Sequence, residues 1–175
     1  PKAAIKRIEQ KTDPAKEEIQ DPYTTESEPP LQYSTDIPQE KTGRGYYPNG
    51  QVKVEGVYER GIPDGLIRTY YENGYLESEG VYKKGTKNGE FKRFYDNGKL
   101  KSMEIYENGT KEGEFKTCYS NGELESDGVY KAGKISGVFD RYHDNGRLKL
   151  EEIYEDGVQK GAVKHFDING RLRSE

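Results

Sequence analysis

The chain has 175 residues, of which 30% are hydrophobic and 34% are charged, and its formal net charge is −4. No stretch approaches the roughly 20 apolar residues of a membrane-spanning helix, and the charge balance argues against a nucleic-acid partner and disfavours a membrane lipid. So low a hydrophobic share excludes one large round core, whereas 15 tyrosines and 21 glycines favour a fold built from thin, repeated layers.

Residues 1–43 differ in composition from the rest of the chain. Six of the eight prolines lie there, whereas every glycine lies at or after Gly43. We interpret the segment as a flexible tether with a short helix over residues 3–20, or else as a peptide that folds onto a partner or back onto the repeats. The chain starts at Pro1 without Met, so a removed signal and a cell-envelope or secreted location are favoured over the cytoplasm.

The remainder, residues 44–175, is an internal repeat. Asn-Gly pairs begin at positions 49, 73, 97, 121, 145 and 169, with a constant period of 24 and no insertions. Recurrence at a fixed period is the signature of repeat architectures. The units span residues 46–69, 70–93, 94–117, 118–141 and 142–165, with a partial unit at 166–175.

Each unit is predicted to form two short strands, over about residues 76–82 and 90–95 in the second unit. Asn-Gly between β-rich runs predicts a type I′ hairpin turn, and Gly85 to Gly89 predicts a longer loop at the other end. Alternation places Leu76 and Ser78 on one face and Glu77 on the other, with a bulge expected at Gly80. The pattern does not decide which face is buried. Because one hairpin is marginally stable alone, the repeated units predict an all-β array of stacked hairpins.

One motif recurs in every unit and carries a family resemblance. Tyr82-x-x-Gly85-x-x-x-Gly89-x-Phe91, followed by Phe94-Tyr95-Asp96-Asn97-Gly98, resembles the MORN repeat, and the following strand at 98–102 resembles its bacterial variant. The resemblance implies an elongated, twisted single-layer array of β-hairpins with an aromatic-lined groove. It also implies a scaffold that binds other proteins, with an antitoxin or immunity-like role as the most specific expectation.

Charge alternates between successive units at one position of the strand that follows each Asn-Gly turn. Glu77, Lys101, Glu125 and Lys149 occupy this position. Stacking would bring Glu77 near Lys101 and Glu125 near Lys149, which favours the native register. The alternative is a charge-patterned binding surface.

No residue pattern predicts catalysis, because almost every polar side chain belongs to a repeated column. The two histidines, His143 and His165, are interpreted as surface or packing residues, and Cys118 as a small buried hydrophobe that leaves no partner for an internal disulfide. We therefore expect no enzyme activity, no catalytic residue, no metal site and no cofactor.

Two columns of tyrosine are the candidate partner-binding residues. Tyrosine offers a large contact area with one polar tip, which suits both a thin core and an interface. The candidate groove consists of Tyr47, Tyr58, Tyr71, Tyr82, Tyr95, Tyr106, Tyr119, Tyr130 and Tyr154.

Another protein, a toxin or an envelope protein, is the expected partner. The rival interpretation is an envelope structural or surface protein that binds glycan or lipid through its tyrosines. A strand at Leu172 also predicts an open sheet edge, guarded by Arg171, Arg173 and Glu175, through which the protein could dimerise.

Overall fold

The computed structural model describes residues 42–174, and their regular structure is a single antiparallel β-sheet. The all-β array of hairpins expected from the sequence is therefore confirmed. Within the described residues, no helix has the length and apolar character that crossing a membrane requires. The tether and short helix predicted for residues 1–43 fall outside this range, except that the first strand already begins at Thr42.

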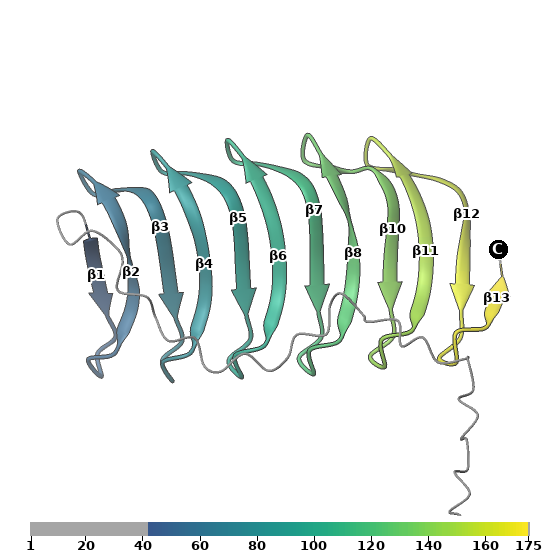
Figure 1. Cartoon of the computed structure of the whole chain (residues 1–175), viewed down its shortest axis with the longest axis horizontal. Coiled ribbons are helices and arrows are strands. Elements are labelled where there is room, and N and C mark those ends of the chain that lie inside the picture. The colour runs from purple at the N-terminus through teal and green to yellow at the C-terminus, as the bar shows by residue number, and fades with distance from the viewer. Residues whose placement is uncertain (1–41, 175) are drawn as a thin grey trace, which may run out of the picture. The chain divides into compact units, whose positions relative to one another are not determined.

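The sheet has 13 strands, and strands that follow one another along the chain are neighbours in the sheet, with β9 as the exception (Figure 1). The short β9 pairs only with β8, which also pairs with β10. The strands are β1 (Thr42–Tyr46), β2 (Val52–Glu59), β3 (Ile62–Tyr70), β4 (Leu76–Lys83), β5 (Thr86–Phe94), β6 (Leu100–Glu107), β7 (Thr110–Cys118), β8 (Leu124–Lys131), β9 (Lys134–Ile135), β10 (Gly137–Tyr142), β11 (Leu148–Glu155), β12 (Val158–Phe166) and β13 (Leu172–Ser174).

The tight two-residue turns lie at the opposite hairpin ends from those the sequence predicted. Lys84 and Gly85 connect β4 to β5 with φ angles of 50° and 78°, and positive φ at both central residues defines a type I′ turn. The predicted loop over residues 85–89 is therefore wrong, because β5 begins at Thr86. The same turn recurs at 60–61, 108–109, 132–133 and 156–157.

The Asn-Gly pairs form a different turn from the type I′ turn that we expected. Five residues connect β3 to β4, and Gly74 has a positive φ whereas Asn73 does not. The Gly74 N–H donates to the Tyr71 carbonyl at 2.9 Å, and the Asn73 side chain accepts from the Tyr75 N–H at 3.1 Å. These features describe a type I turn followed by a left-handed glycine, in which asparagine bridges the turn with its side chain.

The bulge expected at Gly80 lies instead in the next strand. Gly80 pairs with Phe91 and Tyr82 pairs with Lys87, so residues 88–90 of β5 face Val81 alone. Gly89 within this bulge has a φ of 109°. Gly80 has another role: a Cβ atom there would lie 2.5 Å from the Phe91 ring.

A second bulge, at the start of β4, changes which side chains share a face. Thr69 pairs with Ser78 and Tyr70 with Leu76, which leaves Glu77 as the extra residue. In the equivalent place two units on, the Thr117 hydroxyl contacts both the Ser126 hydroxyl at 2.7 Å and the Glu125 carboxylate at 3.1 Å. Neighbouring residues in a flat strand point apart, so the expected assignment of Glu77 and Ser78 to opposite faces is wrong.

One side of the sheet, the aromatic face, contains most of the core. Phe91 contacts the rings of Tyr82 and Tyr106 edge to face, with centroids 5.2 and 5.3 Å apart. Phe115 lies 4.5 Å from Tyr130 by the same measure. No large side chain in residues 42–174 is fully buried, as expected for a single layer. The aromatic face comprises Ile67, Phe91, Phe115, Phe139, Tyr58, Tyr82, Tyr106, Tyr130 and Tyr154, with the side chains that alternate with them.

The other side, the ion-pair face, has charged side chains across its middle. Arg44 contacts Glu55 at 3.0 Å, and Arg68 contacts Glu79 at 3.3 Å. Buried Tyr70 donates its hydroxyl to Glu55 at 2.7 Å, which places Leu76, the cross-strand neighbour of Tyr70, on this face. The ion-pair face comprises Arg44, Glu55, Arg68, Glu79, Asp127, Asp140 and Glu151.

Hydrogen bonds connect each unit to the next at both ends of the hairpins. At the Asn-Gly end, the Tyr71 hydroxyl donates to the Phe94 carbonyl at 2.8 Å, and the Asn73 amide donates to the Asp96 carbonyl at 3.0 Å. At the other end, the Gly109 N–H donates to the Lys87 carbonyl at 2.8 Å. Because each contact spans one unit, the units stabilise one another in sequence.

Candidate binding surface

The structure divides the nine candidate tyrosines into two sets. Tyr58, Tyr82, Tyr106, Tyr130 and Tyr154 belong to the aromatic face, where burial raises the pKa values of Tyr82 and Tyr106. The other four donate their hydroxyls to the backbone carbonyl 23 residues later, at 2.7–2.8 Å, and these are Tyr47, Tyr71, Tyr95 and Tyr119. Both sets have structural roles, and eight of the nine tyrosines also keep part of their surface exposed.

Two hollows open at the Asn-Gly end of the aromatic face. The larger has a volume of about 330 Å³ and the smaller about 210 Å³. Tyr71 and Glu77 line the smaller hollow, and Tyr119 and Glu125 line the larger. Glu77 and Lys101, which the sequence predicted to lie near each other, line the same hollow, as do Glu125 and Lys149.

The two hollows are equivalent sites that lie two units apart along the chain. Seven lining positions of the smaller hollow have an equivalent in the larger, and six of these seven residues are identical. The pairs are Thr69 and Thr117, Tyr71 and Tyr119, Glu77 and Glu125, Ser78 and Ser126, Arg93 and Arg141, Phe94 and Tyr142, and Lys101 and Lys149.

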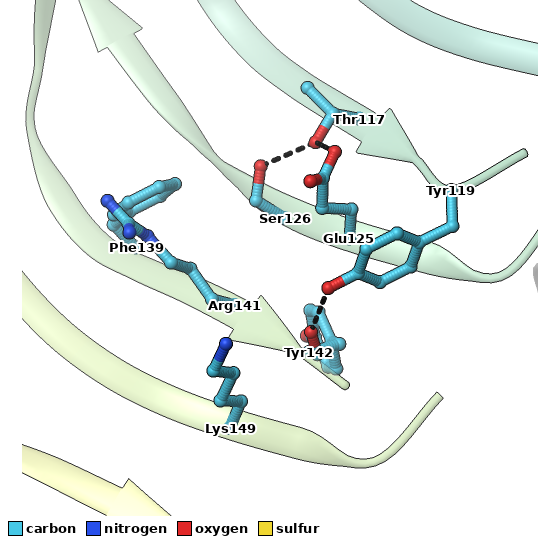
Figure 2. Close-up of a pocket in the computed structure, with 8 residues that line it drawn as sticks. All are labelled: Thr117, Tyr119, Glu125, Ser126, Phe139, Arg141, Tyr142 and Lys149. Atoms are coloured by element: carbon cyan, nitrogen blue, oxygen red, sulfur yellow. Dashed lines mark hydrogen bonds between the residues drawn. The ribbon is translucent and has the colours of Figure 1, made fainter. Parts of the chain in front are cut away.

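Figure 2 shows how the larger hollow is built. The Glu125 carboxylate is held by the Thr117 hydroxyl on β7, and Arg141 on β10 places its guanidinium over the Phe139 ring, 5.0 Å from the centroid. Lys149 on β11 lines the side across from Glu125. The side-chain surface of Arg141 is 50% exposed, although the guanidinium lies 3.7 Å from Glu152. The hollow therefore offers a carboxylate on one hairpin and two cations on the next.

The opposite end of the aromatic face is covered by lysine side chains. The Lys87 ammonium lies 4.5 Å from the Phe91 centroid and 4.7 Å from that of Tyr106, and burial lowers its pKa. Glu104 contacts Lys111 at 2.5 Å and Arg93 at 3.9 Å. Burial alone would raise the pKa of Glu104, but hydrogen bonds from Lys111 and Tyr106 outweigh it and lower the pKa. Lysine also lies over a ring at the Asn-Gly end, where the Lys101 ammonium is 5.4 Å from the Tyr95 centroid, but that end additionally opens into the two hollows.

The cysteine and the two histidines, which were considered for catalysis or metal binding, do not form a reactive site. Cys118 is buried, and burial raises the pKa of its thiol, which disfavours the reactive thiolate. His143 takes the place of a tyrosine, with its Nε2 atom 3.1 Å from the Phe166 carbonyl. His165 is exposed. Within residues 42–174, no group of three or more His, Cys, Asp or Glu side chains is arranged to hold a metal ion.

Sequence reasoning missed the residues that complete the hollows. Arg93 and Arg141 alternate with Thr69 and Thr117 in one column, and Ser78 pairs across the strands with both Thr69 and Arg93. The signal that could have identified these residues was the two-unit period. It is visible at the positions that alternate between Glu and Lys, and also at the positions that alternate between Thr and Arg. Only the bulge at Glu77 and its equivalents brings these two sets of residues onto one face.

The comparisons with known proteins agree with the repeat and its register. The sequence model of the family described as MORN repeat variant matches residues 39–60, 63–84, 87–108 and 111–132, which together make up half of the chain. A search of curated proteins found no match.

Proposed function

Because this chain belongs to the MORN repeat variant family, we propose that it is a non-enzymatic scaffold whose aromatic face binds another protein. Repeats of this family commonly form scaffolds that bind proteins or membranes, and they are generally not catalytic. The finer proposal, a protein partner on the aromatic face, rests on the hollows.

One observation carries the proposal: the Asn-Gly end of the aromatic face combines tyrosine, arginine and open volume. Tyr119 and Arg141 line the same hollow of about 330 Å³, and tyrosine and arginine are enriched in protein interfaces and their hot spots. Thr117, Ser126 and Glu125 add hydrogen-bonding groups beside these anchors. A surface of this composition suits a polypeptide with both charged and apolar side chains.

The charges of the hollows favour a protein over an anionic membrane. Each hollow contains a glutamate beside its two cations, and a polybasic patch, which attracts anionic lipid, has no such acid. Within the proposal, a toxin is the most specific partner, and this antitoxin or immunity-like role rests on the family resemblance alone. A glycan or lipid of the cell envelope is the competing ligand.

The test is capture of partners by the full chain from a lysate of its source organism. We expect the variant Lys101→Glu/Lys149→Glu to lose the proteins that the wild type retains, because both lysines line the hollows. The matched control is Lys83→Glu/Lys131→Glu, which changes the net charge equally at exposed residues near the type I′ turns. Equal capture by the two variants would contradict a binding site on the aromatic face.

The identity of the captured protein separates the finer roles. Recovery of the product of an adjacent reading frame, together with neutralisation of its toxicity by the chain, would support the antitoxin role. If the wild type retains no protein but binds envelope glycan or anionic vesicles, the competing ligand replaces the proposed partner.

A further inference from the structure

Equivalent side chains on consecutive hairpins of the aromatic face are separated by a constant distance. A partner chain that contacts several hairpins has to place its own side chains at the same spacing. Adjacent strands in a sheet lie about 4.8 Å apart, so equivalent side chains on consecutive hairpins are roughly 9.6 Å apart. Tyr71, Tyr95 and Tyr119 follow this spacing, with one ring for each Asn-Gly turn. A ligand lying across the strands therefore meets one tyrosine at each step.

Charge changes sign at each step from β1–β2 to β10–β11, whereas Arg173 at the bulge of β12–β13 repeats the positive charge of Lys149. The bulge residue of the hairpin β3–β4 is Glu77, that of β5–β6 is Lys101, and that of β7–β8 is Glu125. Lys53 in β1–β2 and Lys149 in β10–β11 extend the alternation. All five side chains are exposed, and Arg93 and Arg141 add a second cation to two of the lysine hairpins. The surface thus presents cation, anion, cation, anion and cation at equal steps.

The polyproline II helix is the regular conformation that fits this step. It has three residues per turn and a rise of about 3.1 Å per residue, so every third side chain points the same way, about 9.3 Å from the last. In a β-strand, side chains three apart point to opposite faces. In an α-helix, side chains seven residues apart share a face at about 10.5 Å, roughly 1 Å longer than this step, so the mismatch grows with each hairpin. Proline-rich segments in the polyproline II conformation also dock into grooves lined by aromatic side chains.

We propose that the aromatic face binds a proline-rich polypeptide segment in the polyproline II conformation, with acidic and basic side chains alternating at every third residue. The segment lies across the strands at the Asn-Gly end. Its acidic residues contact the lysine hairpins, its basic residues contact Glu77 and Glu125, and its prolines lie against the row of tyrosines. This inference rests on the proposed function, because it specifies the partner of the same surface.

The first test compares two synthetic peptides that contain the same amino acids in different orders. One is Pro-Pro-Glu-Pro-Pro-Lys-Pro-Pro-Glu-Pro-Pro, and the isomer is Pro-Pro-Pro-Glu-Pro-Lys-Pro-Glu-Pro-Pro-Pro. Fluorescence anisotropy with the labelled peptides and the full chain measures both affinities. We expect the first peptide to bind at least about fivefold more tightly, from two or three surface charge pairs that only its spacing allows. Equal affinities would overturn the proposal.

The second test separates matched spacing from general attraction of charge. The first peptide has a net charge of about −1, so general attraction predicts tighter binding to the more basic variant Glu77→Lys/Glu125→Lys. The proposal predicts the reverse, a loss of about fivefold, because the lysine of the peptide then faces lysine. A third peptide with glutamate in place of that lysine should bind the variant more tightly than the wild type.

A matched control keeps both tests interpretable. Glu59→Lys/Glu107→Lys changes the net charge equally at exposed residues beside the type I′ turns, and it should not lower the affinity for the first peptide. A gain in affinity with Glu77→Lys/Glu125→Lys would overturn the proposal. The capture assay and the peptide comparison can give different results. If a protein is captured through Lys101 and Lys149 but the chain does not distinguish the isomeric peptides, only the polyproline ligand is overturned, and the scaffold function stands.

Discussion

Two parts of the sheet, the first around β4 and β5 and the second around β8 and β10, are equivalent by the two-unit period but differ in a cross-strand pair of charged residues. Glu79 faces Lys92 between β4 and β5, whereas two units later Asp127 faces Asp140 between β8 and β10. The first pairing runs along an unbroken β5, but the equivalent strand is split into β9 and β10. Both carboxylates of the second pair have a buried oxygen without a hydrogen-bond partner.

The comparison shows which face holds the units together. Phe91 and Phe139 are equivalent and almost equally buried, at 7% and 6% exposure, even though the charges behind them differ. The rings of the aromatic face therefore stabilise both parts, while the ion-pair face accepts an unfavourable pair. Substitutions at equivalent positions two units apart should therefore affect the two parts in different ways when they alter the ion-pair face, and in similar ways when they alter the aromatic face.

The largest expected effect is the loss of a buried ring. Phe91→Ala and Phe139→Ala should each lower the free energy of unfolding by about 3 kcal/mol, because each removes a buried aromatic side chain. Urea denaturation followed by circular dichroism measures both. A cost below about 1 kcal/mol for Phe139→Ala alone would show that the aromatic face does not support the second part.

The next effect comes from copying the acidic pair into the first part. Lys92→Asp would place a second carboxylate beside Glu79, and we expect it to destabilise the protein by roughly 1–2 kcal/mol. The same denaturation experiment applies, with Lys92→Asn as the control for loss of the lysine alone. Equal costs for the two variants would mean that repulsion between the acids is negligible.

The reverse change should repair the second part. Burial, followed by the charges of Asp127 and Glu151, raises the pKa of Asp140 to about 6. An acid whose pKa is higher in the folded state stabilises the fold at low pH, and this contribution is lost as the pH rises through about 6. We therefore expect Asp140→Asn to gain about 1 kcal/mol near pH 7.5, after allowance for solvent screening, and much less near pH 4.

The measurement is the difference in unfolding free energy between Asp140→Asn and the wild type at the two pH values. Asp140→Lys should gain at least as much at neutral pH, because it restores an acid facing a base as in Glu79 and Lys92. A gain that does not depend on pH would contradict the titration of Asp140 as its cause.

A smaller effect is expected from the hydroxyls that connect the units. Tyr71→Phe and Tyr119→Phe each remove one hydrogen bond of 2.8 Å to a backbone carbonyl, at a cost of roughly 0.5–1.5 kcal/mol. The two costs should agree, because this contact is the same in both parts. Hydrogen exchange of the Gly74 and Gly122 amides would report the local loosening, and unequal costs would limit the equivalence of the two parts.

The smallest effect lies in the type I′ turns. Lys84 and Ala132 have φ angles of 50° and 48°, and Asn108 occupies the same position in the turn between them. Asparagine tolerates the left-handed conformation better, so Lys84→Asn and Ala132→Asn should each gain roughly 0.5 kcal/mol. Thermal unfolding detects this as a small rise in Tm, and a fall in Tm would contradict the turn assignment.

The period and the hairpins were predictable from the sequence, whereas the turn types were not. Asn73-Gly74 is a strong signal for a type I′ turn, but five connecting residues at that end leave room for a type I turn that the Asn73 side chain bridges. The real type I′ turns contain Lys84 or Ala132 at the first position, where no preference for positive φ is visible. The sheet imposes this conformation through its cross-strand pairs.

The tyrosines of the candidate site were predictable, but the hollows were not. Repetition identifies Tyr71 and Tyr119, yet strict alternation assigns Glu77 and Ser78 to opposite faces. The bulge reverses that assignment and joins Glu77, Arg93 and Lys101 at one hollow. A bulge depends on hydrogen bonding between strands, and spacing along one strand does not report it.

The two-unit alternation also determines how a chain of this kind can change its length by duplication. Copying a single unit would put two glutamate hairpins or two lysine hairpins side by side, as if Glu77 were followed directly by Glu125. Copying two consecutive units together preserves the alternation of glutamate and lysine hairpins that runs from Lys53 to Lys149, and it adds one complete hollow. Arrays that retain this surface should therefore grow by pairs of units, each pair adding one further site of the same kind.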